Sequence, residues 1–114
     1  MNKETEQRTI RSVSECLQFL CDTDDDYGDL KGRVKGLEHR IKVAKAMAFL
    51  ETEGKGTIAD REAMSLSSED YRHKIEELEN TVAELETIAA KRKTCELIIE
   101  VWRSKNANRR QGNI

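Results

Sequence analysis

The side chains with the clearest chemical potential gather near the C-terminus, where basic residues surround the single tryptophan, Trp102. Lys and Arg contacts to phosphate supply most of the non-specific affinity of proteins for nucleic acids, because they release condensed counterions. An aromatic ring beside such cations can stack on an unpaired base. The pattern makes this segment a candidate contact surface for a nucleic acid. Its candidate residues are Lys91, Arg92, Lys93, Arg103, Lys105, Arg109 and Arg110.

Trp102 also has a structural interpretation. It continues an apolar stripe that contains Cys95 and Ile99, and this position favours a role in the core or between subunits. Basic side chains near the C-terminal end of a helix also complement the helix dipole. That effect explains only part of the basic run.

The run Asp22-Thr23-Asp24-Asp25-Asp26 begins like a calcium-binding EF-hand loop. Counted from Asp22, the loop glycine is replaced by Tyr27 and the bidentate glutamate by Arg33, so we expect no calcium site. The aspartates are interpreted instead as a capping linker before the next helix. No metal and no cofactor are predicted.

No motif for catalysis is visible. The cysteines Cys16, Cys21 and Cys95 form no CxxC pair, and their odd number fits a reducing compartment and a filling role on helices. His39 and His73 have no metal-ligand companion at a suitable spacing. Because the abundant carboxylates are expected on solvent-facing helix surfaces, we predict no catalytic residues and no enzymatic activity.

Charge alternates in blocks along the 114 residues, although the net charge is only −2. Residues 1–30 carry a net −5 and residues 46–90 a net −7, whereas 31–45 and 91–114 each carry +5. Two basic blocks on a mildly acidic chain are consistent with a polyanion-binding surface. They are equally consistent with charge pairing between helices or subunits.

The elements that must position these residues are all predicted to be helical. One domain is expected, with helices over 4–21, 27–53, 58–66 and 68–106 and a basic tail over 107–114. The second helix carries an apolar seam with alternating steps of three and four, which is typical of a coiled coil. Its members are Tyr27, Leu30, Val34, Leu37, Ile41, Ala44 and Ala48.

Capping boxes at Thr57 with Asp60 and at Ser67 with Asp70 mark the starts of the third and fourth helices. The apolar stripe of the fourth helix, over 71–102, contains one three-residue slip, which would locally overwind a supercoil. The predicted fold is all-α: an elongated helical hairpin or bundle with coiled-coil seams and one long C-terminal helix. Because a helix of this length exceeds a compact domain of this size, we expect a homo-oligomer.

Several segments resemble a known family. They are Gly-Thr-Ile-Ala-Asp-Arg-Glu-Ala over 56–63, Ser-Ser-Glu-Asp-Tyr over 67–71, and Ile-Glu-Val-Trp-Arg-Ser over 99–104 before a basic tail. This layout is similar to small bacteriophage helical proteins of recombination, the UvsY-like recombination mediators. The resemblance implies a homo-oligomer that binds single-stranded DNA and assists recombinase loading. It would place the DNA contacts in residues 31–45 and 91–110.

Two other classes of function remain open. A small phage-encoded inhibitor could bind a host complex with an acidic surface that mimics DNA, or the protein could be a structural adaptor. Salt-dependent binding to DNA separates the first class from these two. No stretch is apolar enough to span a membrane and no secretory signal is visible, so we expect the cytoplasm, or the host cytoplasm if the chain is phage-encoded.

Overall fold

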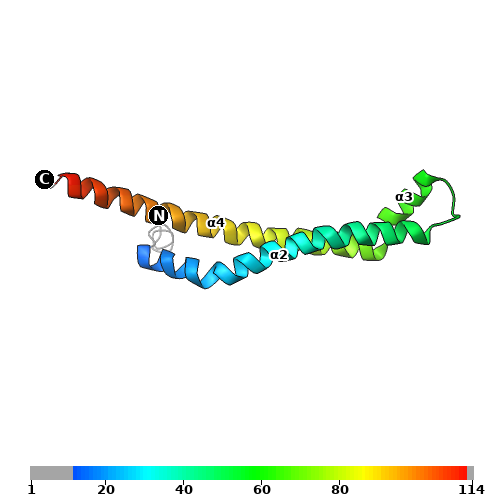
Figure 1. Cartoon of the computed structure of the whole chain (residues 1–114), viewed down its shortest axis with the longest axis horizontal. Helices are drawn as coiled ribbons and strands as arrows, with labels where there is room; N and C mark the ends of the chain where they lie inside the picture. The colour runs from blue at the N-terminus through cyan, green and yellow to red at the C-terminus, as the bar shows by residue number, and fades with distance from the viewer. Residues whose placement is uncertain (1–11, 113–114) are drawn as a thin grey trace, which may run out of the picture. The chain divides into compact units, whose positions relative to one another are not determined.

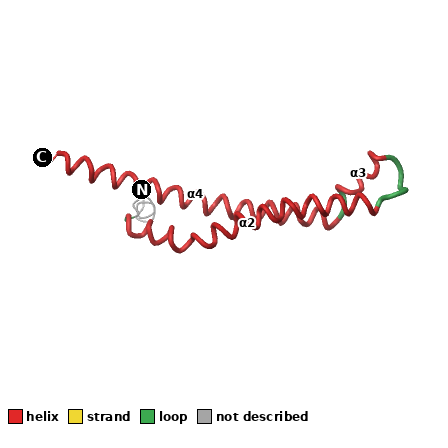
Figure 2. The backbone as a smooth tube through the Cα atoms, viewed as in Figure 1, coloured by secondary structure: helices red, strands yellow, loops and turns green. Residues whose placement is uncertain are grey.

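The computed structural model describes residues 12–112, which form three helices: α2 (Val13–Glu51), α3 (Ile58–Leu66) and α4 (Glu69–Gly112). Figure 1 shows their order along the chain, and Figure 2 shows that loops, not strands, connect them within the described range. The prediction of an all-α fold with one long C-terminal helix is confirmed. The first residues of the helix predicted over 4–21 lie outside the described residues.

The chain divides into two compact units that share the long helices. The first, called here the α3 unit, is Gly28–Leu85 and contains α3 with parts of α2 and α4. The second, called here the terminal unit, pairs the described residues 12–27 of α2 with residues 86–112 of α4. The expectation of a single domain stays a prediction.

The predicted break between the first two helices is wrong. Residues 22–26 lie inside α2, which runs without interruption from Val13 to Glu51. Asp costs a helix interior at most about 0.7 kcal/mol relative to Ala, so a short aspartate run does not by itself end a helix. Within the run, the Thr23 hydroxyl donates to the Phe19 carbonyl at 2.8 Å, and Asp24 is held by a cation from α4. The segment is therefore neither a linker nor a loop of EF-hand geometry.

The seam predicted over 27–48 forms the core of the α3 unit from Leu30 onward. Leu30, Leu37, Ala44 and Ala48 are buried, and Val34 and Ile41 between them are half-buried. Since α3 and α4 are the elements that share this unit with α2, the chain itself covers the seam. This seam therefore does not require a second copy, and the homo-oligomer expected from the length of α4 stays a prediction.

The inward face of α4 has a more regular register than its apolar residues indicate. Thr81 is only 5% exposed. Its hydroxyl donates to the Glu77 carbonyl at 2.8 Å, so this buried polar group has a hydrogen-bond partner. With Lys74 and Thr81 included, the three-four alternation runs from Tyr71 to Ile99 without the predicted slip. Ile75 and Val82 lie next to Lys74 and Thr81 on the helix surface. An apolar pattern that passes through Ile75 and Val82 therefore shows a slip that the inward face does not have.

Serine and threonine residues start all three helices. Thr57 and Asp60 form the predicted capping box, with both of its hydrogen bonds at 3.2 Å. The second predicted capping box, Ser67 with Asp70, is wrong. The Tyr71 N–H donates to Ser68 Oγ at 3.1 Å, so Ser68 caps α4, and Tyr71 has no carboxylate to complete a box. The Ser67 hydroxyl instead donates to the Met64 carbonyl at the end of α3.

One arginine fixes α3 to the end of α2. The Arg61 guanidinium donates to Thr52 Oγ1 at 3.1 Å and to the Phe49 carbonyl at 3.3 Å, and lies 4.1 Å from the centre of the Phe49 ring. The intervening turn includes Gly54 and Gly56, whose φ angles are 80° and 102°. A cation at the carbonyl end of a helix also complements its dipole.

Candidate nucleic-acid interface

Arg92 is committed to contacts inside the terminal unit. One guanidinium nitrogen donates to the Leu20 carbonyl at 2.9 Å and to Thr23 Oγ1 at 2.7 Å, and the other pairs with Asp24 at 2.7 Å. The guanidinium also lies 4.8 Å from the centre of the Tyr27 ring. The Arg92 side chain is 14% exposed, so it joins α4 to α2 and does not face an external phosphate.

The assignment of Arg92 to the DNA-binding set is therefore corrected. Its planar fork presents several donors in fixed directions, which suits a carbonyl, a hydroxyl and a carboxylate at once better than the single ammonium group of a lysine does. The signal was present in the sequence, because Arg92 occupies the inward stripe between Ile88 and Cys95. The flanking Lys91 and Lys93 are exposed, as the prediction requires.

Trp102 does not lie in the core. It continues the inward face of α4, yet 50% of its surface is exposed. The last turns of α4 carry a hollow lined by Trp102, Arg103, Ser104, Asn106, Ala107 and Arg110. Arg103 and Arg110, one heptad apart, share a helix face beside the indole ring. A flat aromatic side chain with two neighbouring cations is an arrangement that suits an unpaired base and its phosphates.

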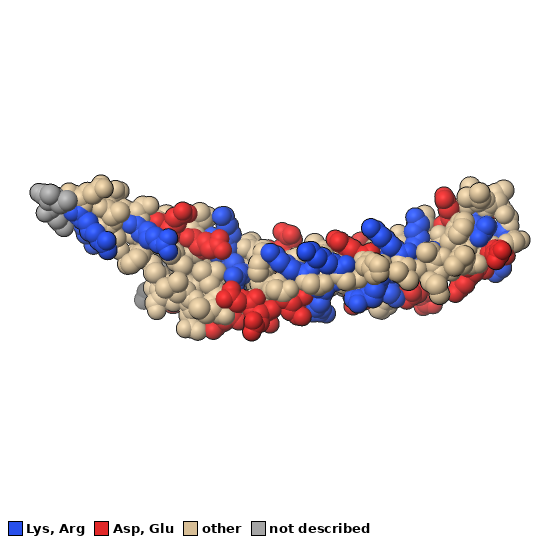
Figure 3. All heavy atoms as spheres, in the orientation of Figure 1, with Lys and Arg blue, Asp and Glu red and all other residues tan. Residues whose placement is uncertain are grey.

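The four cations of the last turns are exposed: Arg103, Lys105, Arg109 and Arg110. None of them forms an ion pair with another residue in the range 12–112. No acidic residue follows Glu100 in the sequence. In the view of Figure 3, Lys and Arg gather toward the C-terminal end of α4, whereas acidic and basic side chains are interspersed over most of the remaining surface.

The helix dipole accounts for only part of this charge. Arg109 and Arg110 lie in the last turn of α4, where a positive charge is favoured. Arg103 and Lys105 lie further from the end, and the dipole effect fades beyond the last turn. Neither the helix dipole nor an ion pair within residues 12–112 therefore explains Arg103 and Lys105.

The second basic block, residues 31–45, lies on α2 in the α3 unit. Its basic side chains are exposed: Lys31, Arg33, Lys35, Arg40, Lys42 and Lys45. Glu38 lies among them, and no tryptophan accompanies them. The block offers charge for phosphate but lacks the indole that marks the C-terminal segment.

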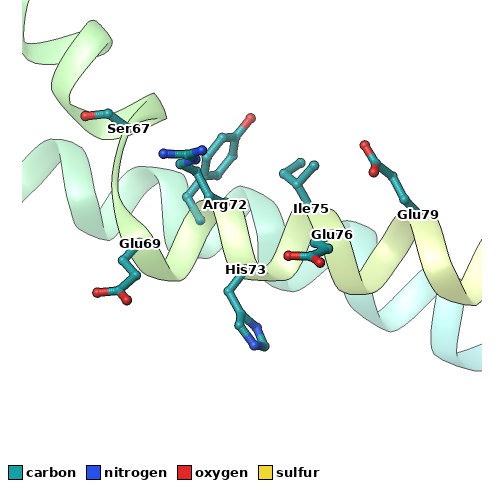
Figure 4. A pocket seen from close by; sticks show the side chains of 8 residues that line it. Ser67, Glu69, Arg72, His73, Ile75, Glu76 and Glu79 are labelled. Atoms are coloured by element: carbon teal, nitrogen blue, oxygen red, sulfur yellow. The ribbon is translucent and has the colours of Figure 1, made fainter.

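A separate hollow lies over the first turns of α4 (Figure 4). Its lining includes Glu69, His73 and Glu79, whose side chains point in different directions around the helix. A catalytic or metal-binding set needs groups that converge on one ligand. This hollow therefore provides no such set.

The remaining candidates for chemistry are dispersed. Cys16 and Cys95 are buried, whereas Cys21 is exposed, and none of the three forms a disulfide within residues 12–112. No group of three or more His, Cys, Asp or Glu residues could hold a metal within residues 12–112. Over the same range, no helix is both long and apolar enough to cross a membrane. Comparison with protein-family models, curated proteins and solved structures finds no match to this chain.

Proposed function

We propose that the C-terminal part of α4 binds single-stranded DNA, with Trp102 as a stacking platform and Arg103 and Arg110 as phosphate contacts. The observation that carries this proposal is the half-exposed indole of Trp102 in one hollow with two cations that have no ion-pair partner among the described residues. Lys105 and Arg109 add charge to the same turns, and Lys91 and Lys93 extend the basic surface toward the N-terminus of the helix.

The biological role that we propose rests on the resemblance to UvsY-like mediators. In that role the protein is a homo-oligomeric recombination accessory protein in the cytoplasm that presents single-stranded DNA to a recombinase. One such site on each subunit is weak, since non-specific binding has a Kd of about 1–100 µM at physiological salt. Several linked sites on one strand raise the overall affinity.

The direct test is the salt dependence of binding to a fluorescently labelled single-stranded oligonucleotide, followed by anisotropy. Each phosphate contact contributes about 0.7 to the slope of log K against log salt for a single strand. The double variant Arg103→Ala/Arg110→Ala should flatten the slope by about 1.4 and weaken binding at low salt. Since both residues are exposed, helicity should not change.

The matched control removes two exposed cations from the α3 unit, in the variant Lys55→Ala/Arg72→Ala. It changes the net charge equally and should leave the slope close to that of the wild type. Equal losses in both variants would show that only net charge matters. No binding of the wild type at about 50 mM salt, where phosphate contacts are strong, would reject the proposal.

A second candidate function, an acidic protein-binding surface, has one supporting observation. Exposed glutamates crowd the first half of α4: Glu76, Glu77, Glu79, Glu84 and Glu86. A DNA-mimicking inhibitor would use this face and bind no DNA. Failure of the wild type to bind oligonucleotide would therefore favour this second candidate.

A further inference from the structure

The terminal unit carries a second heptad stripe, on the face of α4 that does not contact α2. Its positions alternate in steps of four and three, and every one of them is uncharged and at least partly open to solvent. Its members are Ala90, Thr94, Leu97, Val101, Ser104 and Asn108. Leu97 and Val101 at its centre are 49% and 54% exposed. In a chain with 37% charged residues, an uncharged helix face of this regularity requires an explanation.

We propose that this stripe is the contact surface of a parallel coiled-coil dimer between two copies of the chain. With Val101 at an a position, Leu97 occupies a d position and Asn108 the next a position. A β-branched residue at a with Leu at d favours two parallel strands, and an Asn at a sets the register. A parallel pair stacks Leu97 on Leu97, Val101 on Val101 and Asn108 on Asn108.

The charges that flank the stripe complement each other in the parallel arrangement. In parallel coiled coils, each g position lies beside the following e position of the other helix. The g residues Glu86 and Glu100 thereby lie beside the e residues Lys91 and Lys105 of the second copy. The intermediate g residue, Lys93, lies beside an isoleucine and meets no like charge.

Antiparallel arrangements are less favourable. If Val101 packs against Leu97 of an antiparallel copy, Glu100 lies beside Glu100, and Lys91 lies beside Lys105. A shift by one heptad removes these repulsions and brings Lys93 beside Glu100. That shift also packs Leu97 against Thr94 and Val101 against Ala90, so the two large apolar residues no longer contact each other.

The dimer has a consequence for the surface around Trp102. Parallel pairing places the two copies of this tryptophan at the same end of the assembly. Lys91 and Lys105 then lie beside glutamates at the edge of the interface, whereas Arg103 and Arg110 lie outside it and stay fully available to an external ligand. The inference does not depend on DNA binding, because its test measures mass and uses no DNA.

The first test is sedimentation equilibrium of the full chain. The interface is small, so we expect a reversible dimer, with twice the 13.1 kDa mass of one chain, at protein concentrations of up to about 200 µM. Leu97→Asp should give the monomer mass with unchanged helicity. The matched control is Met47→Asp, which places the same charge at an exposed apolar position of the α3 unit and should leave the dimer intact.

Charge exchange then tests the orientation. Glu100→Lys replaces two attractions with two repulsions and should weaken the dimer about tenfold, since an exposed pair is worth up to about 1 kcal/mol. Lys105→Glu in the same chain should restore it in a parallel pair. Restoration by Lys93→Glu instead would show an antiparallel pair and overturn the proposed arrangement. A wild type that stays monomeric, or a Leu97→Asp variant that dimerises normally, would overturn the interface itself.

Discussion

Two arginines of α4 show why residue type alone does not define a contact surface. Arg92 and Arg103 both belong to the basic run, yet Arg92 is held by three hydrogen bonds to α2 and Arg103 is exposed. The difference follows from their heptad positions. Arg92 lies on the inward face of α4, whereas Arg103 lies one residue beyond that face, next to Trp102. Charge and composition predict that the segment is basic. They do not show which cations are used inside the fold.

Removal of Arg92 should destabilise the protein. Hydrogen bonds to charged groups contribute about 1.5–3 kcal/mol each at most, and the bond to Asp24 contributes less because that carboxylate is exposed to water. Arg92→Ala should therefore lower the free energy of unfolding by about 2 kcal/mol. Arg92→Lys should recover only part of this loss, because an ammonium group cannot reproduce the fork. Urea denaturation followed by circular dichroism measures both effects.

Lys93→Ala is the control for this change, since Lys93 is the exposed neighbour of Arg92. Its free energy of unfolding should stay within about 0.5 kcal/mol of the wild type. Equal stability of the Arg92→Ala and Lys93→Ala variants would contradict the role of Arg92 in joining α2 to α4.

At the scale of elements, periodicity predicted most of the fold. The bounds of α3 and its capping box follow directly from Thr57, Asp60 and the break at Gly54 and Gly56. The continuity of α2 through residues 22–26 could not be predicted from local preference, because an aspartate run is typical of a helix cap. The residue that stabilises Asp24 within the helix is Arg92, which is 68 residues away in the sequence. The burial of Thr81 has a different, local reason: its hydroxyl donates to a carbonyl of its own helix, so a polar residue fits a position that an apolar pattern passes over.

The continuity of α2 can be tested at Asp25, an exposed residue of the acidic run. A proline in a helix interior removes a hydrogen bond and clashes with the preceding turn, at a cost of about 3 kcal/mol or more. Asp25→Pro should therefore lower the free energy of unfolding by about that amount, whereas Asp25→Ala should be neutral or slightly stabilising. A proline variant as stable as the wild type would show that residues 22–26 form a linker.

At the scale of the whole molecule, the two units use the long helices differently. In the α3 unit, the heptad seam of α2 is covered by the chain itself. In the terminal unit, the last turns of α4 keep Trp102, Leu97 and Val101 exposed. The surface available for a ligand or for a second copy therefore includes the basic last turns of α4, where no acidic residue follows Glu100. The sequence alone located that charge, but the exposure of the indole emerged only from the fold.

The central claim is that Trp102 contacts single-stranded DNA, and the intrinsic fluorescence of the chain tests it most directly. Trp102 is the single tryptophan, so its emission reports on this site alone. Titration with an unlabelled single-stranded oligonucleotide at about 50 mM salt should quench the emission, because a base stacks on the ring, and added salt should reverse the quenching. Unchanged emission at saturating oligonucleotide would contradict the claim.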